Sequence, residues 1–263
     1  LDYASGSTQP LEQITAALGD AIGSGVRWQD SLALLRVAEQ GAVAGQAQLG
    51  ESTRLLVGTL NAYGLGVDQV RRVSDVFFRT VGDGTIKISD LANDFGRIAP
   101  LAAAAGVPIE TIGAALATLT QQGIQPSEAV TYLRSALSAI INPSSQAATL
   151  AQQLGIQFDA QALKSRGLAT VLNDVQRATG GNVQQMAELF GGTEALSAVL
   201  GLTGEKAAKF STELARMQNA AGATQTAFAR FAGALGPAAQ QLKNAIEVGL
   251  TGIGDRLLDE SGG

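Results

Sequence analysis

The sequence contains no cysteine and no histidine. Without cysteine there is no disulfide framework, and without both residues the usual zinc sites are excluded. Histidine general acids and bases are excluded as well, together with the Ser-His and Cys-His nucleophile pairs. Enzymes that depend on these groups are therefore ruled out.

Aromatic residues are scarce at 5%, whereas apolar residues reach 46% and charged residues 16%. This balance is typical of a folded globular chain, and its alanine content indicates a core of closely approaching helices. The net charge of −5 argues against a surface that wraps nucleic acid, which needs clustered cations. The one dense basic pair, Arg71 and Arg72, is flanked by Asp68 and Asp75 at helical spacing, which predicts a solvated helix face.

Long apolar runs are also missing. The longest, residues 98–109, has about 12 residues and contains prolines and a glycine, whereas a membrane-spanning helix needs about 20. No signal peptide is recognisable. Because the chain begins with Leu1, we expect it to be a fragment of a longer protein.

Apolar residues recur in steps of three and four almost throughout, as in Val70, Val73, Phe77 and Val81. Strict alternation is confined to residues 85–88. The pattern predicts an all-α fold without a sheet, made of roughly ten short amphipathic helices and two longer ones.

Helix boundaries are marked by residue types that favour them. We expect Ser89 and Thr193 to be N-caps, because their hydroxyls can accept from free N–H groups of a first turn. First helical turns are predicted at four prolines: Pro10, Pro108, Pro126 and Pro143. Helix ends are predicted at six glycines: Gly64, Gly82, Gly106, Gly123, Gly155 and Gly180.

The two longer helices are predicted over residues 28–63 and 224–258. In the first, Gly41 and Gly45 would let another helix approach closely, and tight core packing is favoured over a special dimer motif. In the second, Gly236-Pro237 should kink or split the helix. Its apolar stripe would either cover the domain or pair with another helix as in a coiled coil.

We divide the chain into an N-terminal helical part (1–142), a second part of the same core (143–221) and a C-terminal helical segment that leads out of the domain (222–263). Residues 64–95 and 106–137 share one pattern of helices and breaks at an offset of about 42 residues, which suggests a duplicated helical hairpin.

Groups that could carry chemistry are few. The glycine pairs at 64/66, 82/84 and 191/192 complete no phosphate loop, and no calcium loop is formed around Asp83. Asp90 and Asp94 lie one turn apart at a helix edge, where Asp90 would favour the start of the helix. A last acidic group, Asp255, Asp259 and Glu260, is expected to be a solvated tail. We therefore assign no catalytic, cofactor-binding or metal-binding residue and predict no cofactor.

The middle of the chain nevertheless resembles a known family. The segments NAYGLGVDQVRRVSDVFFRTV (61–81) and AAAAGVPIETIGAALATLTQQG (102–123) are similar to the core domain of tail tape-measure proteins of long-tailed bacteriophages and prophages. The similarity covers about residues 15–235. These motifs are structural and define no catalytic residue.

The resemblance implies a non-enzymatic structural protein in the lumen of the virion tail, made in the host cytoplasm, that sets tail length, scaffolds tube assembly and leaves ahead of the DNA. The implied partners are itself, as a threefold or sixfold assembly, the tail tube protein, tail assembly chaperones and tail tip proteins, without specific nucleic-acid binding. The alternative is a membrane-active module that inserts into the host envelope during ejection, with transient membrane contact.

Overall fold

The computed structural model describes residues 7–231, and the chain divides into two units, Leu1–Thr224 and Gln225–Gly263. The first unit contains all the elements from α2 to α15. Within the described range no strand is formed: of the alternating residues 85–88, the first three form a loop and Ile88 begins a helix. The all-α prediction is therefore confirmed. The boundary proposed at residue 143 remains a prediction.

The first unit is built from short helices that follow one another closely. Its first part contains α2 (Leu11–Gly23), α3 (Trp28–Ala44), α4 (Leu49–Tyr63), η1 (Val67–Gln69), α5 (Val70–Asp83), α6 (Ile88–Asp94), η2 (Phe95–Arg97), α7 (Ala99–Ala104) and α8 (Ile109–Thr120). Its second part contains α9 (Pro126–Ile141), α10 (Ser145–Gln153), α11 (Ala160–Arg166), α12 (Leu168–Ala178), α13 (Val183–Phe190), α14 (Thr193–Leu202), η3 (Gly204–Lys206) and α15 (Ala207–Gln218).

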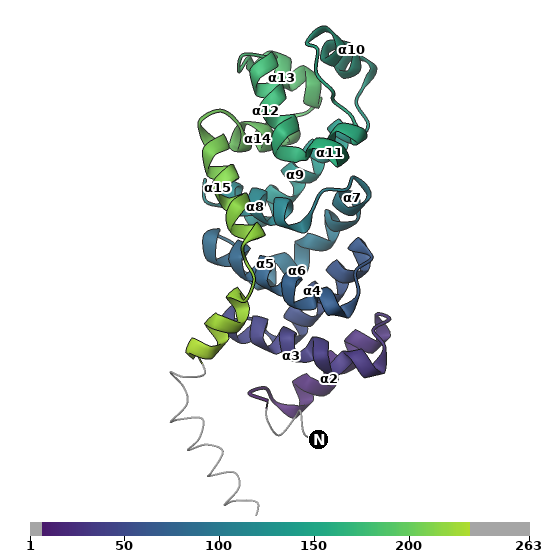
Figure 1. The fold of residues 1–263 in the computed structure, drawn as a ribbon, viewed down its shortest axis with the longest axis vertical. Coiled ribbons are helices and arrows are strands. Elements are labelled where there is room, and N and C mark those ends of the chain that lie inside the picture. The colour runs from purple at the N-terminus through teal and green to yellow at the C-terminus, as the bar shows by residue number, and fades with distance from the viewer. Residues whose placement is uncertain (1–6, 232–263) are drawn as a thin grey trace, which may run out of the picture. The chain divides into compact units, whose positions relative to one another are not determined.

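Helices of this unit stack in successive layers from α2 and α3 towards α13 (Figure 1). The two segments predicted to be similar hairpins do form helix pairs, α5 with α6 and α8 with α9. The pairs stack in register, since α5 contacts α8 and α6 contacts α9. Each layer buries the apolar stripe of the next, which is how stacked helical hairpins obtain a continuous core.

The last helix of the unit reverses the direction of this stack. After α14, helix α15 runs back past α8 towards α5 (Figure 1). Its buried residues Phe210, Glu213 and Met217 lie on one stripe, and the rest of the helix is largely exposed. Helix α15 therefore packs across layers whose residues come earlier in the sequence. We call this helix the strap.

The predicted long helix over residues 28–63 is wrong, because the chain breaks between α3 and α4. Gln46 adopts a left-handed conformation with φ of 52°. The carboxylate of Glu51 accepts a hydrogen bond from the Gln48 N–H at 3.0 Å and starts a new helix. The expected close approach is confirmed: a Cβ at Gly45 would lie 2.6 Å from Ile88 Cγ1, so α6 packs where the glycine leaves room.

Both predicted N-caps are also wrong. Ser89 is the second residue of α6, whose start is stabilised by the Lys87 N–H donating to the Asp90 carboxylate at 2.9 Å. Thr193 is the first residue of α14 and follows the capping position at Gly192. At α6 the apolar Ile88 extends the helix one residue beyond Ser89, whereas α14 begins at Thr193 itself.

The other boundary residues fall close to the predicted positions. Five of the six glycines, all except Gly82, have positive φ, and Gly64 is the left-handed C-cap of α4. Gly82 lies inside α5 instead, whose C-cap is Gly84. Among the prolines, Pro126 is the first residue of α9, whereas Pro10 and Pro108 precede their helices by one residue and Pro143 by two.

The second predicted long helix, 224–258, lies almost entirely outside the described residues. No helix in the described range combines the length and the apolar character that crossing a membrane requires.

Candidate functional site

The acidic residues Asp90 and Asp94, to which we assigned no catalytic role, make contacts that stabilise the fold. Asp90 caps the start of α6, and Asp94 forms an ion pair with Arg97 at 3.0 Å. The Arg97 guanidinium also donates to Thr131 Oγ1 on α9 at 2.9 Å. Within residues 7–231 no group of three or more acidic side chains could hold a metal ion. The acidic residues 255, 259 and 260 lie outside this range.

The pKa of one tyrosine, Tyr63, is shifted by its surroundings. Burial raises the pKa of Tyr63 above its usual range, and the negative charge of Glu110 adds to the rise. The phenol donates to the Val107 carbonyl at 3.3 Å. Since a raised pKa keeps the hydroxyl protonated, Tyr63 acts as a hydrogen-bond donor that ties α4 to the start of α8.

Helix α8, which carries the most characteristic family motif, is the centre of the unit. Every residue from Ile109 to Thr120 is buried, and the helix contacts α5, α9, α14 and α15. A helix enclosed on all sides needs small residues where neighbours cross it. The sequence ETIGAALATLT meets this need with one glycine and three alanines.

Glycines allow the closest crossings. A Cβ at Gly113 of α8 would lie 2.5 Å from Thr80 Oγ1 on α5, and one at Gly201 of α14 would lie 2.5 Å from Leu119 Cδ2. Both distances are below any normal carbon contact. The motif is therefore explained by packing against α5 and α14.

The basic pair of the sequence lies on an exposed helix face. Arg72 is exposed and forms an ion pair with Glu110 at the start of α8, whereas Asp75 is buried in α5. The predicted solvated face is therefore wrong for Asp75. It holds for Asp68, Arg71 and Arg72, which are exposed.

The strap α15 is held by an unusual polar contact. The Glu213 side chain is fully buried and pairs with Lys209 Nζ at 2.9 Å. Arg216 pairs with Asp83 at 3.0 Å, on the last turn of α5. One oxygen each of Asp83 and Glu213 is buried without a hydrogen-bond partner. Such a network contributes little net stability, because the desolvation of its carboxylates offsets the attraction between the charges.

Two buried carboxylates anchor the first and last described segments of the unit. Glu39 of α3 accepts hydrogen bonds from Ser7 Oγ at 2.9 Å and from the Thr8 N–H at 2.7 Å. Asp75 of α5 accepts from the N–H groups of Gly222 at 2.8 Å and Thr224 at 2.9 Å. Helices α3 and α5 are in contact. The first and last described segments of the unit are therefore hydrogen-bonded to neighbouring helices.

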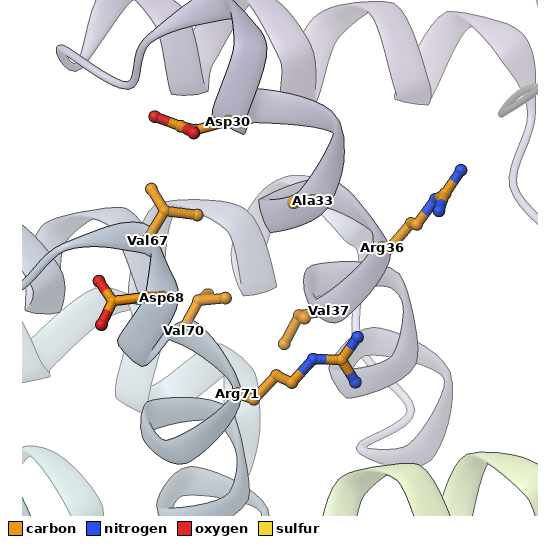
Figure 2. Close-up of a pocket in the computed structure, with 8 residues that line it drawn as sticks. All are labelled: Asp30, Ala33, Arg36, Val37, Val67, Asp68, Val70 and Arg71. Carbon is orange, nitrogen blue, oxygen red and sulfur yellow. The ribbon is translucent and has the colours of Figure 1, made fainter.

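A surface groove runs between α3 and the η1–α5 segment (Figure 2). It has a volume of about 400 Å³ and an apolar floor that includes Ala33, Val37 and Val70. Four charged side chains rim it: Asp30, Arg36, Asp68 and Arg71. The combination suits a contact with another macromolecule better than the enclosure of a small substrate.

Sequence reasoning missed the anchoring role of Glu39, Asp75 and Glu213. A signal was present for Glu213, since it lies on the apolar stripe between Phe210 and Met217. An acidic residue on an apolar stripe indicates a buried, paired carboxylate. For Glu39 and Asp75 the hydrogen-bond donors are far away in the sequence, which no local pattern reveals.

Comparison with known proteins agrees with the structural character of these residues. Residues 4–191 match the family described as phage-related minor tail protein. No solved structure matches the chain significantly.

Three curated relatives are phage proteins. The chain is 31% identical to the tape measure protein of Pneumococcus phage Dp-1 over 149 residues, which are 57% of this chain and 13% of that protein. It is 25% identical to the probable tape measure protein of Escherichia phage P2, over 70% of this chain and 23% of the relative. It is also 25% identical to that of Clostridium phage phiCD119, over 73% and 21%.

The chain thus spans less than a quarter of the length of each of these relatives. The family match covers well over half of the chain and includes the buried helix α8. The chain therefore belongs to the phage-related minor tail protein family.

Proposed function

We propose that this chain is a non-enzymatic segment of a tape measure protein that contributes to tail length, supports assembly of the tail tube and leaves the virion ahead of the DNA. The observation that carries the proposal is the similarity to tape measure proteins, which extends over 57% of this chain in one relative and 70% in another. The residues of the family motif serve packing in α8, which is consistent with a structural role.

The proposed surroundings follow from this role. The segment would lie in the tail lumen after assembly in the host cytoplasm, in contact with the tube protein, tail tip proteins, assembly chaperones and further copies of itself. A threefold or sixfold arrangement of copies would match a cyclic tube, since oligomers adopt closed symmetries.

The compact fold and an extended tape differ greatly in length. As one straight helix, residues 15–235 would span roughly 330 Å, at 1.5 Å per residue. As a compact domain of this size, they would have a radius of gyration of about 17 Å. We propose that the domain either occupies one end of the tape or opens its hairpins into an extended form inside the tail.

In-frame removal of residues 15–235 from the parent gene tests the proposal, with tail lengths measured by electron microscopy. Tails shorter by roughly 330 Å would indicate an extended ruler segment, and a shortening of about 40 Å or less a compact one. A tandem duplication of the same residues is the matched control and should lengthen tails by the same amount. Normal, infectious tails of unchanged length from both genes would contradict the proposal.

The alternative of a membrane-active module is separable by experiment. Dye release from lipid vesicles should not occur with the purified chain if the role is structural. Release at low protein concentration would favour the membrane-active module instead.

A further inference from the structure

The two ends of the stack expose different kinds of side chain. Helix α10 belongs to one end, and all its exposed residues are polar: Ser145, Gln146, Thr149, Gln152 and Gln153. Helices α2 and α3 form the other end (Figure 1). Of the seven large hydrophobic residues that are exposed in the described range, four lie in these two helices: Leu11, Ile22, Trp28 and Leu32. Since the terminal layers of a helical stack need a polar outer face, the α10 end has the character of a cap and the α2 end that of an inner layer.

Helix α2 carries two apolar stripes but buries only one of them. It packs on α3 and α4 through its buried residues, which are Ile14, Ala17 and Ala21. A second stripe, which we call the α2 stripe, lies beside the first in steps of four, three and four residues: Leu11, Thr15, Leu18 and Ile22. Leu11 is 64% exposed and Ile22 is 39% exposed. Most of the α2 stripe is therefore left uncovered by the described residues.

A neighbouring helix has room to approach the α2 stripe closely. Gly19 lies one turn after Thr15, and a Cβ built there would meet no atom within 4 Å. Glycine allows another segment to come close to the helix backbone, as Ile88 of α6 does at Gly45. The α2 stripe thus has the shape of a helix contact without the second helix.

Charges on α2 narrow the choice of partner. Glu12 and Asp20 are exposed, and no basic residue occurs between Leu11 and Gly23. These two carboxylates would repel an anionic membrane surface. A second copy of α2 would bring carboxylates against carboxylates, which is unfavourable as well. The partner that fits is an amphipathic helix whose apolar stripe is flanked by lysine or arginine.

The path of the chain before α2 indicates where such a helix comes from. Ser7 Oγ and the Thr8 N–H donate to Glu39 of α3, so the polypeptide enters the unit at the α2–α3 layer. In each of the three curated relatives, more than three quarters of the polypeptide lies outside the matched part. Consecutive helices are usually neighbours in space, and each layer of this unit buries the stripe of the next. A helix that precedes α2 in a longer parent protein is therefore within reach of the α2 stripe.

We infer that the α2 stripe is the docking site for one further helix of the same polypeptide, which precedes this chain in the parent protein and carries an apolar stripe flanked by basic residues. Docking would bury Leu11 and Ile22 and add one layer to the stack. The inference rests on the proposed function, because it takes the chain to be a segment of a longer tape measure protein.

Hydrogen exchange followed by mass spectrometry tests the inference on the parent protein and on the 263-residue chain. We expect amides of α2 to exchange at least about tenfold more slowly in the parent protein, because a docked helix suppresses local opening at the end of the stack. Amides of α13, at the other end of the stack, should exchange equally in both proteins and are the internal control.

A substitution in the α2 stripe tests whether the slower exchange comes from this surface. Ile22→Lys places a charge in the apolar contact and opposite basic residues, so it should return exchange of α2 in the parent protein to within about threefold of the rate in the 263-residue chain. Leu200→Lys is the matched control, since Leu200 is also in the last turn of its helix and is 42% exposed. This control should leave α2 unchanged in both proteins. In the 263-residue chain neither variant should alter the exchange of α2, and circular dichroism verifies both folds.

Equal exchange of α2 in the two proteins would overturn the inference. Slow exchange that survives Ile22→Lys would also overturn it, because the contact would then lie on another surface. The same holds for exchange of α2 in the 263-residue chain that slows as protein concentration rises, which would indicate pairing of copies instead. None of these results touches the proposed role in tail length, because the deletion and duplication experiment measures that role independently.

Discussion

Helices α8 and α15 pack against each other but differ in how much of each helix is buried. Helix α8 is buried on all sides by α5, α7, α9, α14 and α15, with a single acidic residue at its start. Helix α15 buries one stripe, and in the middle of that stripe is the carboxylate of Glu213. Cooperative packing around α8 should make it the most stable part of the unit, whereas α15 should open at a lower free energy.

This difference matters for a chain proposed to change from a compact to an extended form. A strap that opens first would release the end of the unit from Asp75 and expose α8 to solvent. The stacked layers could then separate one after another, beginning with those that α15 covers. Four substitutions test the difference in stability between the two helices.

The largest effect is expected in α8. Leu116→Ala removes a fully buried side chain and leaves a cavity in the core around α8, so it should lower the free energy of unfolding by about 4 kcal/mol. Urea denaturation followed by circular dichroism measures the loss. Leu200→Ala on α14, where the side chain is 42% exposed, is the control and should cost under about 0.5 kcal/mol.

A smaller loss of stability is expected in α15, and it should appear as local opening of this helix. Met217→Ala deletes the buried thioether that touches Thr80 Oγ1 at 3.7 Å, at a cost of about 3 kcal/mol. The cost should appear as local release of α15, which limited proteolysis detects as cleavage within residues 203–222. Gln218→Ala on the exposed side of the same helix should leave the cleavage rate unchanged, and equal cleavage in both variants would contradict a strap.

The anchor at Asp75 should contribute less. Asp75→Asn keeps the shape of the side chain, but its amide has only one acceptor oxygen for the N–H groups of Gly222 and Thr224. We expect a loss of about 1.5 kcal/mol, because a hydrogen bond to a charged acceptor is removed. Faster amide exchange at residues 222 and 224, with unchanged exchange in α8, would confirm that the effect is local.

The smallest effect is expected to have the opposite sign. Glu213→Met replaces a buried carboxylate by an apolar side chain of similar size, while Lys209 and Arg216 are about half exposed and can be hydrated. Docking of α15 should become stronger by about 1 kcal/mol. Glu213→Gln serves as the comparison. A marked destabilisation by Glu213→Met would show that the ion pairs hold the strap.

Much of the fold could be predicted from the sequence, because most helices carry their own apolar stripe. The steps from Val70 to Phe77 place α5 correctly, and Gly64 marks the end of α4 through its left-handed backbone. The break after α3 was missed because the apolar steps continue across residues 45–48. The chain turns there through the left-handed backbone of Gln46, and Glu51 caps the start of α4.

The contacts that fasten the unit were beyond sequence reasoning for another reason. Asp75 accepts from residues 147 and 149 positions further along the chain, and its neighbours in sequence suggested a solvated face. The groove likewise combines residues of α3 with residues of η1 and α5. Local patterns report which face of a helix is apolar, but not which distant segment covers it.

Native-state hydrogen exchange on the 263-residue chain tests the central contrast most directly. We expect amides of α8 to exchange only through global unfolding, and amides of α15 to exchange through a partial opening of lower free energy. Equal free energies of opening for the two helices would contradict this expectation, because α15 would then be an inseparable part of the core.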